Sequence, residues 1–559
     1  MPTTPREVHQ TDEAGHRPGG MLAVFAGPIV GLLVWALLNW LAPGLPEDGR
    51  RAAGLLAWMA TWWLGEVLPL GVTALLPLVA LPMLGVLSVR EAAAPYADRI
   101  VFLFMGGFIL ALAMERWNLH RRIALVVMLL VGTSPRRLLL GIMLATALLS
   151  MWVSNTATAL MMIPIALGVT ALVESEHEPE AQARAGAGLH TTASSAAGVV
   201  EAELTDGHRP SLALRVRGGG FGTAVVLGVA YAASIGGLGT PIGSPPNAVL
   251  TSFLDRTYGH SIGFGNWMLA GVPFVLVFIP VAWAYLAFFA CRIPAAAGSG
   301  DKHGARTHLR EQYAQLGPIS RGEWGVMACF ALTVAGWVLR EPVILLLEAR
   351  GMSGASAFIK SSIDDAAIAI VGGLMCFVWP VSTRRRVYLM DWPTMRKLPW
   401  DILLLFGGGL SLAAGVQASG LDKALGAALA GLGDWSPWSV VLVCSTISVF
   451  VSEFTSNVAQ ANVFYPILGG IAESTRIDPM VLLFPCCLSL SCAFMLPMGT
   501  PPNAIAFSTG RVSMKRFALT GIGMNLIGIV LVMLVSLLVL PHIPGMALTV
   551  TPAPAASAP

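Results

Sequence analysis

Two short polar stretches interrupt long apolar segments of this chain, and in both a serine precedes an asparagine. The first is Ser154-Asn155-Thr156 and the second is Ser456-Asn457-Val458. Each is followed along the chain by a break rich in glycine and proline, at residues 236–247 and 496–503. Helix-breaking polar backbone at membrane depth is tolerated only where it is buried in protein or lines a cavity. A matched pair of such breaks therefore predicts a transporter binding site.

Neutral hydroxyl and amide side chains surround these breaks, and no Lys or Arg lies near either signature. A hard cation such as Na⁺ prefers hydroxyl, amide and carbonyl oxygens, and the N-terminal ends of broken helices favour oxyanions. Such a site can hold an anion beside bound cations without a basic side chain. A single Ser or Thr is more simply explained by a hydrogen bond between helices. The set recurs in both halves of the chain, however, and the recurrence favours a binding site.

The composition predicts the elements that position these side chains. Hydrophobic residues make up 55% of the chain and charged residues 12%, which is typical of a polytopic membrane protein. We expect apolar segments at 21–42, 52–66, 67–88, 99–118, 137–172, 221–254, 264–291, 323–347, 364–382, 399–419, 438–473, 479–508 and 516–541.

Two of these segments, 137–172 and 438–473, exceed the length of about 20 residues that one transmembrane helix needs. Each holds a Ser-Asn pair near its centre. We interpret both as re-entrant helical hairpins, with one long tilted helix as the alternative. The predicted fold class is an all-α polytopic membrane protein with eleven transmembrane helices and two re-entrant hairpins.

Basic residues predict the orientation in the membrane. Three loops are rich in Lys and Arg, namely 292–323, 383–398 and 509–516. The loops expected on the opposite side carry one Lys or Arg each, namely 255–263, 420–437 and 474–478. Because short basic loops are cytoplasmic, we expect the N-terminus inside and the C-terminus outside, in a bacterial inner membrane. The two hairpins then open on opposite sides.

The two halves of the chain repeat one pattern. Phe104 lies 51 residues before Asn155, and Phe406 lies 51 residues before Asn457, so an offset of 302 residues relates the halves. Leu103-Phe-Met-Gly-Gly in the first half matches Leu405-Phe-Gly-Gly-Gly in the second. We therefore predict two inverted repeats, which make two mirror-related conformations available for alternating access.

The expected organisation follows from these repeats. It comprises a cytoplasmic tail at 1–20, scaffold helices at 21–88, a first repeat at 89–254 with hairpin 137–172 and a cytoplasmic insertion at 173–220, scaffold and connecting segments at 255–390, a second repeat at 391–541 with hairpin 438–473, and a disordered tail at 542–559.

Over nearly all of residues 21–541, the chain resembles the divalent anion–sodium symporter family, which moves di- and tricarboxylates or sulfate. The shared motifs are Trp62-Trp63-Leu-Gly-Glu66-Val-Leu-Pro69, Thr73-Ala-Leu-Leu-Pro77, the two Ser-Asn signatures and the Gly-Thr-Pro and Pro-Pro-Asn breaks. The resemblance implies Na⁺ as the co-transported ion, and a homodimer in which a transport domain moves like an elevator against a fixed scaffold.

The resemblance also implies particular site residues. The first sodium site would use Ser150, Ser154, Asn155 and the Gly239 carbonyl. The second sodium site would use Ser452, Thr455, Asn457 and the Gly499 carbonyl. The substrate would contact Ser154, Asn155, Thr156, Thr240, Ser456, Asn457, Val458, Thr500 and Pro501. Val458 cannot donate a hydrogen bond as Thr156 can, so the two signatures need not contact the substrate equally.

We expect a sodium-coupled importer of C4 dicarboxylates such as succinate, malate or fumarate, with membrane lipid and no nucleic acid among its partners. A symporter of tricarboxylate (citrate) or sulfate is an alternative, and so is a sodium-independent dicarboxylate exchanger, which would place a basic side chain where the cation sits. A channel is disfavoured, because its filter uses symmetry-related identical loops. No nucleophile–base pair, metal cluster or nucleotide loop predicts an enzyme. The sequence leaves open the preferred anion, the sodium stoichiometry and the roles of Glu66 and Glu453.

Overall fold

The computed structural model describes residues 21–132, 134–175, 220–293, 304–428, 435–475 and 477–543. The expected tail 1–20 lies outside these ranges, as do nearly all of the insertion 173–220 and of the tail 542–559. Within the described residues, seven helices are long and apolar enough to cross a membrane, or eight if one bent pair is a single span. This is the composition of a polytopic integral membrane protein, and the count of eleven spans stays a prediction.

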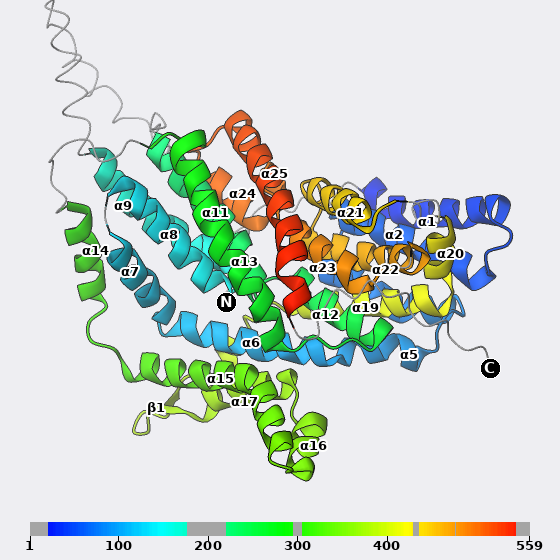
Figure 1. Cartoon of the computed structure of the whole chain (residues 1–559), viewed down its shortest axis with the longest axis horizontal. Coiled ribbons are helices and arrows are strands. Elements are labelled where there is room, and N and C mark those ends of the chain that lie inside the picture. Colours follow the sequence, from blue (N-terminus) through cyan, green and yellow to red (C-terminus); the bar gives the residue numbers. More distant parts are fainter. Residues whose placement is uncertain are drawn as a thin grey trace, which may run out of the picture.

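Helices account for almost all of the described chain (Figure 1). In the first half they are α1 (Met21–Leu41), α2 (Glu47–Leu64), α3 (Leu70–Thr73), α4 (Leu76–Met83), α5 (Val89–Ala93), η1 (Ala94–Ala97), α6 (Arg99–Arg116), α7 (Leu119–Val131), α8 (Pro135–Ser150), α9 (Asn155–Ser175), α11 (Gly220–Gly236), η2 (Gly237–Gly239), α12 (Pro245–Tyr258), α13 (Phe264–Ala284) and the π-helical turn η3 (Tyr285–Ala290).

The second half begins with α14 (Gly304–Gln315), α15 (Arg321–Ala349), α16 (Ser353–Ser362) and α17 (Asp365–Val378). A short hairpin of β1 (Pro380–Ser382) and β2 (Val387–Tyr388) follows. The remaining helices are α18 (Trp392–Met395), α19 (Trp400–Ala418), α20 (Leu421–Ala428), α21 (Pro437–Ser452), α22 (Asn457–Thr475), α23 (Pro479–Leu490), η5 (Pro497–Gly499), α24 (Pro501–Ser508), α25 (Met514–Leu538) and η6 (Leu540–His542).

Helix starts recur along the chain at the spacing that the motifs predict. Helices α7, α8 and α9 begin at residues 119, 135 and 155, and α20, α21 and α22 begin at 421, 437 and 457, each 302 residues later. Proline opens α8 and α21, and it also opens α12 and α24 after the two Gly/Pro breaks. Proline suits the first helical position because the N–H that it lacks would have no partner there. The order of elements therefore repeats, and inversion of the repeats stays a prediction.

The glycine motifs let two helices of this pattern approach other helices closely. Gly106 of α6 packs on Ala369 of α17, where an added Cβ would lie 2.4 Å from the Ala369 carbonyl carbon. Gly408 of α19 packs on Ala74, where an added Cβ would lie 2.0 Å from the carbonyl oxygen. A side chain at either glycine would force the helices apart. The aromatic rings of Phe104 and Phe406 meet edge to face, with centroids 4.7 Å apart, so the two motif helices share one core.

Helix α11 is the most deeply buried of the apolar helices among the described residues. Of its apolar stretch 94% is buried, compared with 11% for α1 and 17% for α15. It packs against α8, α9, α13 and α24, whereas α15 and α17 lie along α6 at one edge of the molecule (Figure 1). Helix α11, which leads into the first break, therefore also contacts α24, which follows the second break.

Residues at the turn between α6 and α7 bind the start of α15. Arg122 of α7 forms an ion pair with Glu323, with Nε 2.6 Å from Oε1 and side-chain exposures of 7% and 6%. The Arg122 guanidinium also donates to the Gly317 carbonyl at 3.1 Å. The ring of Trp117 lies against Gly322, where an added Cβ would come within 2.0 Å of it. This joint ties the first half of the chain to the second.

Candidate functional site

Both Ser-Asn signatures lie where a helix stops and a new helix starts. Helix α8 ends at Ser150 and α9 begins at Asn155, and α21 ends at Ser452 and α22 begins at Asn457. The alternative of one long continuous helix in each segment is therefore wrong. The helix ends leave N–H and C=O groups without intrahelical partners at the level of the signatures. A hairpin that enters and leaves on one side of the membrane stays a prediction.

Asn155 lies among backbone oxygens of the first half. In the carboxamide orientation that satisfies its hydrogen bonds, the Asn155 amide nitrogen donates to the carbonyls of Ala233 at 3.1 Å and Gly243 at 3.2 Å, and to Ser150 Oγ at 2.7 Å. Ser150 Oγ in turn donates to the Ala233 carbonyl at 2.7 Å. Gly237 leaves room for this group, because an added Cβ would lie 2.6 Å from the Asn155 carboxamide. The structure thus brings together Ser150 and Asn155, two of the predicted ligands of the first sodium site.

Thr240 forms a hydrogen bond between the Gly/Pro break after α11 and the non-helical residues that follow α8. Its hydroxyl donates to the Met151 carbonyl at 2.5 Å and accepts from the Gly243 N–H at 3.0 Å. The Gly239 carbonyl, which the resemblance implied as a sodium ligand, instead faces α13. An added Cβ at Gly271 of that helix would lie 3.0 Å from the Gly239 oxygen.

Within the first break, the carbonyl that lies beside the Asn155 carboxamide is that of Gly243, which the resemblance did not imply as a ligand. A signal for it was present in the sequence. Gly243 precedes Ser-Pro-Pro-Asn247 as Gly499 precedes Thr-Pro-Pro-Asn503. Aligning the two breaks on Pro-Pro-Asn would therefore have paired Gly499 with Gly243 rather than with Gly239.

The asparagines of the Pro-Pro-Asn motifs close both broken helices in the same way. Asn247 donates to the carbonyls ten and seven residues before it, those of Gly237 at 3.0 Å and Thr240 at 2.9 Å. Asn503 donates to the carbonyls at the same two spacings, those of Ala493 at 2.9 Å and Leu496 at 3.1 Å. Each amide satisfies carbonyls that an unwound segment would otherwise leave unpaired.

In the second half, the Asn457 carboxamide oxygen is buried and has no hydrogen-bond partner among the described residues. Ser452 Oγ donates to the Val449 carbonyl at 2.7 Å, and Thr455 Oγ1 donates to the Val451 carbonyl at 3.0 Å. No hydrogen bond within the described ranges joins Asn457 to Ser452, Thr455 or Gly499. The second set of predicted sodium ligands is therefore less tightly connected than the first.

The predicted substrate residues differ in accessibility. Ser154, Asn155, Thr156, Ser456, Asn457 and Val458 are partly buried, Thr240 and Thr500 are buried, and Pro501 is exposed. The Ser154 hydroxyl accepts from the Ala157 N–H at 3.3 Å and so caps α9. The Thr500 hydroxyl accepts from the Asn503 N–H at 3.4 Å and caps α24. Pro501 is thus the most accessible residue of the predicted substrate site, and the signatures are more accessible than Thr240 and Thr500.

Glu453 is fully buried at the end of α21, and its carboxylate accepts hydrogen bonds from the non-helical segment that follows α23. Its Oε1 accepts from the N–H groups of Phe494 at 2.8 Å and Met495 at 2.9 Å and from the Asn525 amide at 2.6 Å. Its Oε2 accepts from the Leu496 N–H at 2.9 Å. Four donors thus converge on one carboxylate. This geometry favours a structural anchor over a role beside the second cation.

The first break contacts the second half of the chain in the interior of the molecule. Ser244 Oγ, beside the first break, lies 3.4 Å from Ser491 Oγ at the end of α23. The Tyr465 hydroxyl of α22 donates to the Pro246 carbonyl at 3.1 Å. These contacts join the Gly/Pro break of the first half to helices α22 and α23 of the second half.

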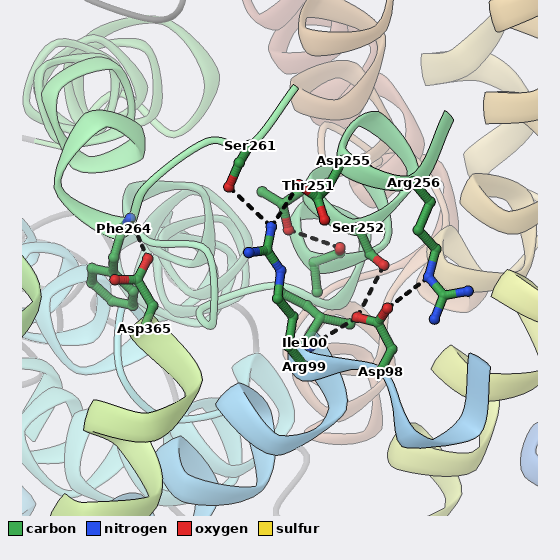
Figure 2. Close-up of polar contacts among 11 residues, drawn as sticks. Asp98, Arg99, Ile100, Thr251, Ser252, Asp255, Arg256, Ser261, Phe264 and Asp365 are labelled. Carbon is green, nitrogen blue, oxygen red and sulfur yellow. Dashed lines mark hydrogen bonds and ion pairs between the residues drawn. The ribbon is translucent and has the colours of Figure 1, made fainter. Parts of the chain in front are cut away.

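Helix α12, which follows the first break, is fixed at its far end by two crossed ion pairs (Figure 2). Arg256 Nε lies 2.6 Å from Asp98 Oδ2, and an Arg99 nitrogen lies 2.8 Å from Asp255 Oδ1. Both partners are Asp-Arg dipeptides, one at the start of α6 and one near the end of α12. A single approach of the two helices therefore neutralises all four charges.

A cavity of about 320 Å³ adjoins these ion pairs. Its lining includes Arg99, Thr251, Ser261 and Asp365, and also Pro241 from the first break. Asp365 at the start of α17 accepts from the Phe264 N–H at 2.8 Å (Figure 2). The cavity thus extends from a charge-paired rim to the backbone that follows Thr240.

Comparisons with known proteins cover almost the whole chain. A family model described as the sodium:sulfate symporter transmembrane region matches residues 23–541. The sodium-dependent dicarboxylate transporter SdcS of Staphylococcus aureus strain bovine RF122 / ET3-1 is 36% identical over 533 residues, covering 94% of this chain and 92% of that protein. The transporter of the same name in strain MSSA476 matches with the same identity and coverage.

A solved structure shares the fold. The crystal structure of the Alcanivorax borkumensis YdaH transporter matches with a TM-score of 0.52 and 14% identity, covering 92% of this chain and 97% of that one. At this identity the likeness concerns the fold alone.

Proposed function

The chain belongs to the divalent anion–sodium symporter family, as its motifs predicted, and from this membership we propose that it imports C4 dicarboxylates together with Na⁺. The family match spans residues 23–541 and so includes every motif on which the resemblance rested. The chain is a membrane transporter and not an enzyme, and Na⁺ is the ion that the family co-transports. Support for a dicarboxylate substrate comes from the curated relatives, which are named sodium-dependent dicarboxylate transporters.

One observation carries the site assignment, namely the buried and unpartnered carboxamide oxygen of Asn457. A buried acceptor without a partner costs about 1–3 kcal/mol, and a bound cation would remove that cost. Amide and hydroxyl oxygens are the donors that a hard cation prefers. We therefore propose Asn457, Ser452, Thr455 and the Gly499 carbonyl as ligands of one sodium ion.

For the other sodium ion we propose Ser150, Ser154 and Asn155. The Gly243 carbonyl is a further candidate beside the Gly239 carbonyl, because it lies 3.2 Å from the Asn155 carboxamide, and a half-turn of that amide would direct its oxygen, in place of its nitrogen, toward the same carbonyl. A carbonyl ligand has to face the side chains with which it shares an ion.

The anion would lie between these two sodium sites. Helices α9 and α22 both begin at the signature asparagines, so the partial positive charge of each helix N-terminus lies at a signature. Carboxylates could then bind at Ser154, Asn155, Thr156 and Thr240 in one half and at Ser456, Asn457, Val458, Thr500 and Pro501 in the other. No Lys or Arg is needed, which avoids an unpaired buried cation whenever the site is empty.

The proposal extends to the mechanism. The repeating order of elements supports two repeats with re-entrant hairpins, which we propose are inverted. Alternating access by an elevator movement within a homodimer is what the family resemblance implies. The basic loops support a cytoplasmic N-terminus and an external C-terminus in a bacterial inner membrane.

Uptake into proteoliposomes tests the proposed function. Purified protein should accumulate labelled succinate when Na⁺ is high outside, and malate and fumarate should compete better than citrate or sulfate. Asn457→Ala protein provides the matched control for the site. Equal uptake without Na⁺ into vesicles loaded with succinate would identify an exchanger and overturn the proposal.

A further inference from the structure

We propose that a basic cavity between α25 and the π-helical turn η3 binds the headgroup of an anionic phospholipid. The cavity has a volume of about 340 Å³ and lies between Tyr285 of η3 and the first turns of α25, where Lys515, Arg516 and Leu519 line it. It shares no lining residue with the cavity beside the ion pairs or with the proposed sodium and substrate sites. The inference depends on the chain spanning a membrane and not on what it transports.

The described residues place no carboxylate beside the two cations of the cavity. Within the described residues, neither Lys515 nor Arg516 has a carboxylate in ion-pair distance, whereas Arg99, Arg122 and Arg256 each have one. Lys515 is exposed and Arg516 is partly buried. Two adjacent cations at a cavity, with a hydroxyl group from Ser513 on its wall, match the charge and hydrogen-bonding capacity of a phosphate group.

The surroundings of the cavity favour a lipid over a soluble phosphate. Leu519, which lines it, is 61% exposed, and Phe289 of η3 is 73% exposed. Acyl chains could lie on these side chains while the headgroup meets Lys515 and Arg516. The turn at 509–516 is one of the basic loops expected on the cytoplasmic side, where basic pockets between transmembrane helices bind anionic headgroups.

The walls of the cavity are held at a fixed separation. The Tyr285 hydroxyl donates to the Thr520 carbonyl of α25 at 3.1 Å. Gly523 makes room for the same hydroxyl, because an added Cβ would lie 2.2 Å from it. Tyr285 belongs to a π-helical turn, an element that often marks functional positions. The cavity is therefore formed before any ligand binds.

Native mass spectrometry of the full-length protein tests the proposal. Wild-type protein in detergent is mixed with equal amounts of phosphatidylglycerol and phosphatidylcholine, and the retained molecules are counted. We expect preferential retention of phosphatidylglycerol, with at least tenfold weaker apparent affinity in Lys515→Ala/Arg516→Ala. The Lys515→Gln/Arg516→Gln variant keeps long polar side chains without charge, and it should lose the lipid to the same extent.

Arg384→Ala/Arg385→Ala is the matched control, because it removes two adjacent exposed arginines from another basic loop without touching the cavity. We expect this control to retain phosphatidylglycerol as wild type does. Equal loss in the control would reveal general attraction of anionic lipid to basic loops and overturn the proposal. Displacement of the lipid by inorganic phosphate at equal concentration would also overturn it, because the ligand would then be the free anion.

Discussion

Replacing Glu453 by glutamine tests whether this carboxylate anchors the non-helical segment between α23 and η5. A carboxylate only accepts hydrogen bonds, and four donors from Phe494, Met495, Leu496 and Asn525 face it. Glutamine keeps the size but offers one acceptor oxygen. If that oxygen takes the place of Oε1, the new NH₂ group takes the place of Oε2. It then faces the Leu496 N–H, and because both groups are donors the hydrogen bond from Leu496 is lost.

The expected loss of stability follows from these contacts. Leaving one buried donor unpaired costs about 1–3 kcal/mol, and each of the other three bonds loses the extra strength of a charged acceptor, about 1 kcal/mol. Removing a buried charge returns part of this loss, because the neutral amide is less costly to bury. We therefore expect a net destabilisation of about 2–4 kcal/mol.

Thermal unfolding monitored with a thiol-reactive fluorophore suits this protein, because all seven cysteines are buried and free. An unfolding entropy of roughly 2.1 cal/mol/K per residue gives about 1 kcal/mol/K for a unit of about 500 residues. The variant should therefore melt about 2–4 °C below wild type in sodium-free buffer. Glu348→Gln is the matched control, because Glu348 is 41% exposed and pairs with Lys360, and exposed pairs contribute about 0–1 kcal/mol.

One result would refute the anchor role. If Glu453→Gln has the same Tm as the wild-type protein but needs more sodium for half-maximal uptake, then Glu453 acts on the second cation instead. A lower Tm with an unchanged sodium dependence supports the anchor.

Four further predictions concern the site and its surroundings. Asn155→Ala and Asn457→Ala should each abolish sodium-driven succinate uptake by reconstituted protein, and near-normal uptake by either would remove the site assignment. Thr156→Val should weaken succinate binding by the roughly 1.5–3 kcal/mol of a hydrogen bond to a charged group, and so raise the half-saturating succinate concentration. Val458→Thr should keep uptake and change the ranking of malate and citrate as inhibitors. An unchanged ranking in both variants would mean that this position does not touch the substrate. Arg256→Ala should lower the Tm more than Arg99→Ala, because its partner Asp98 is 11% exposed and Asp255 is 31% exposed, and equal shifts would contradict this. Uptake should rise when the vesicle interior is made negative, by up to about 2.3 kcal/mol per net charge per 100 mV, if more than two Na⁺ accompany a dianion; no response would indicate a neutral stoichiometry.

Much of the fold could be predicted because its signals are local. The interruption at Ser154-Asn155 and the Pro-Pro-Asn breaks follow from what Gly, Pro and Asn do to their own backbone. The span expected at 323–347 is the continuous helix α15, Arg321–Ala349. The span expected at 67–88 is instead the two short helices α3 and α4, since Pro69 and Pro77 open new helices rather than continue one.

The rest could not be predicted because it depends on contacts between distant residues. The partners of Glu453 lie 41 to 72 residues further along the chain. No sequence pattern next to Glu453 indicates which residues they are. The Gly239 carbonyl lies against Gly271 of α13, a contact between residues 32 positions apart. Hydropathy identifies a helix that can span a membrane, but it does not identify the neighbour against which the helix packs.

The buried pair of Arg122 and Glu323 has a consequence for biosynthesis. The two residues are separated by 201 positions in the sequence. At about 5–20 residues per second, a ribosome needs about 10–40 s to reach Glu323 after Arg122 has emerged. During that time the guanidinium has to remain in water or against lipid phosphates at the membrane surface. The first half therefore stays incompletely packed until α15 is inserted, and a chain truncated before residue 323 should be a substrate for membrane proteases rather than a stable half-transporter.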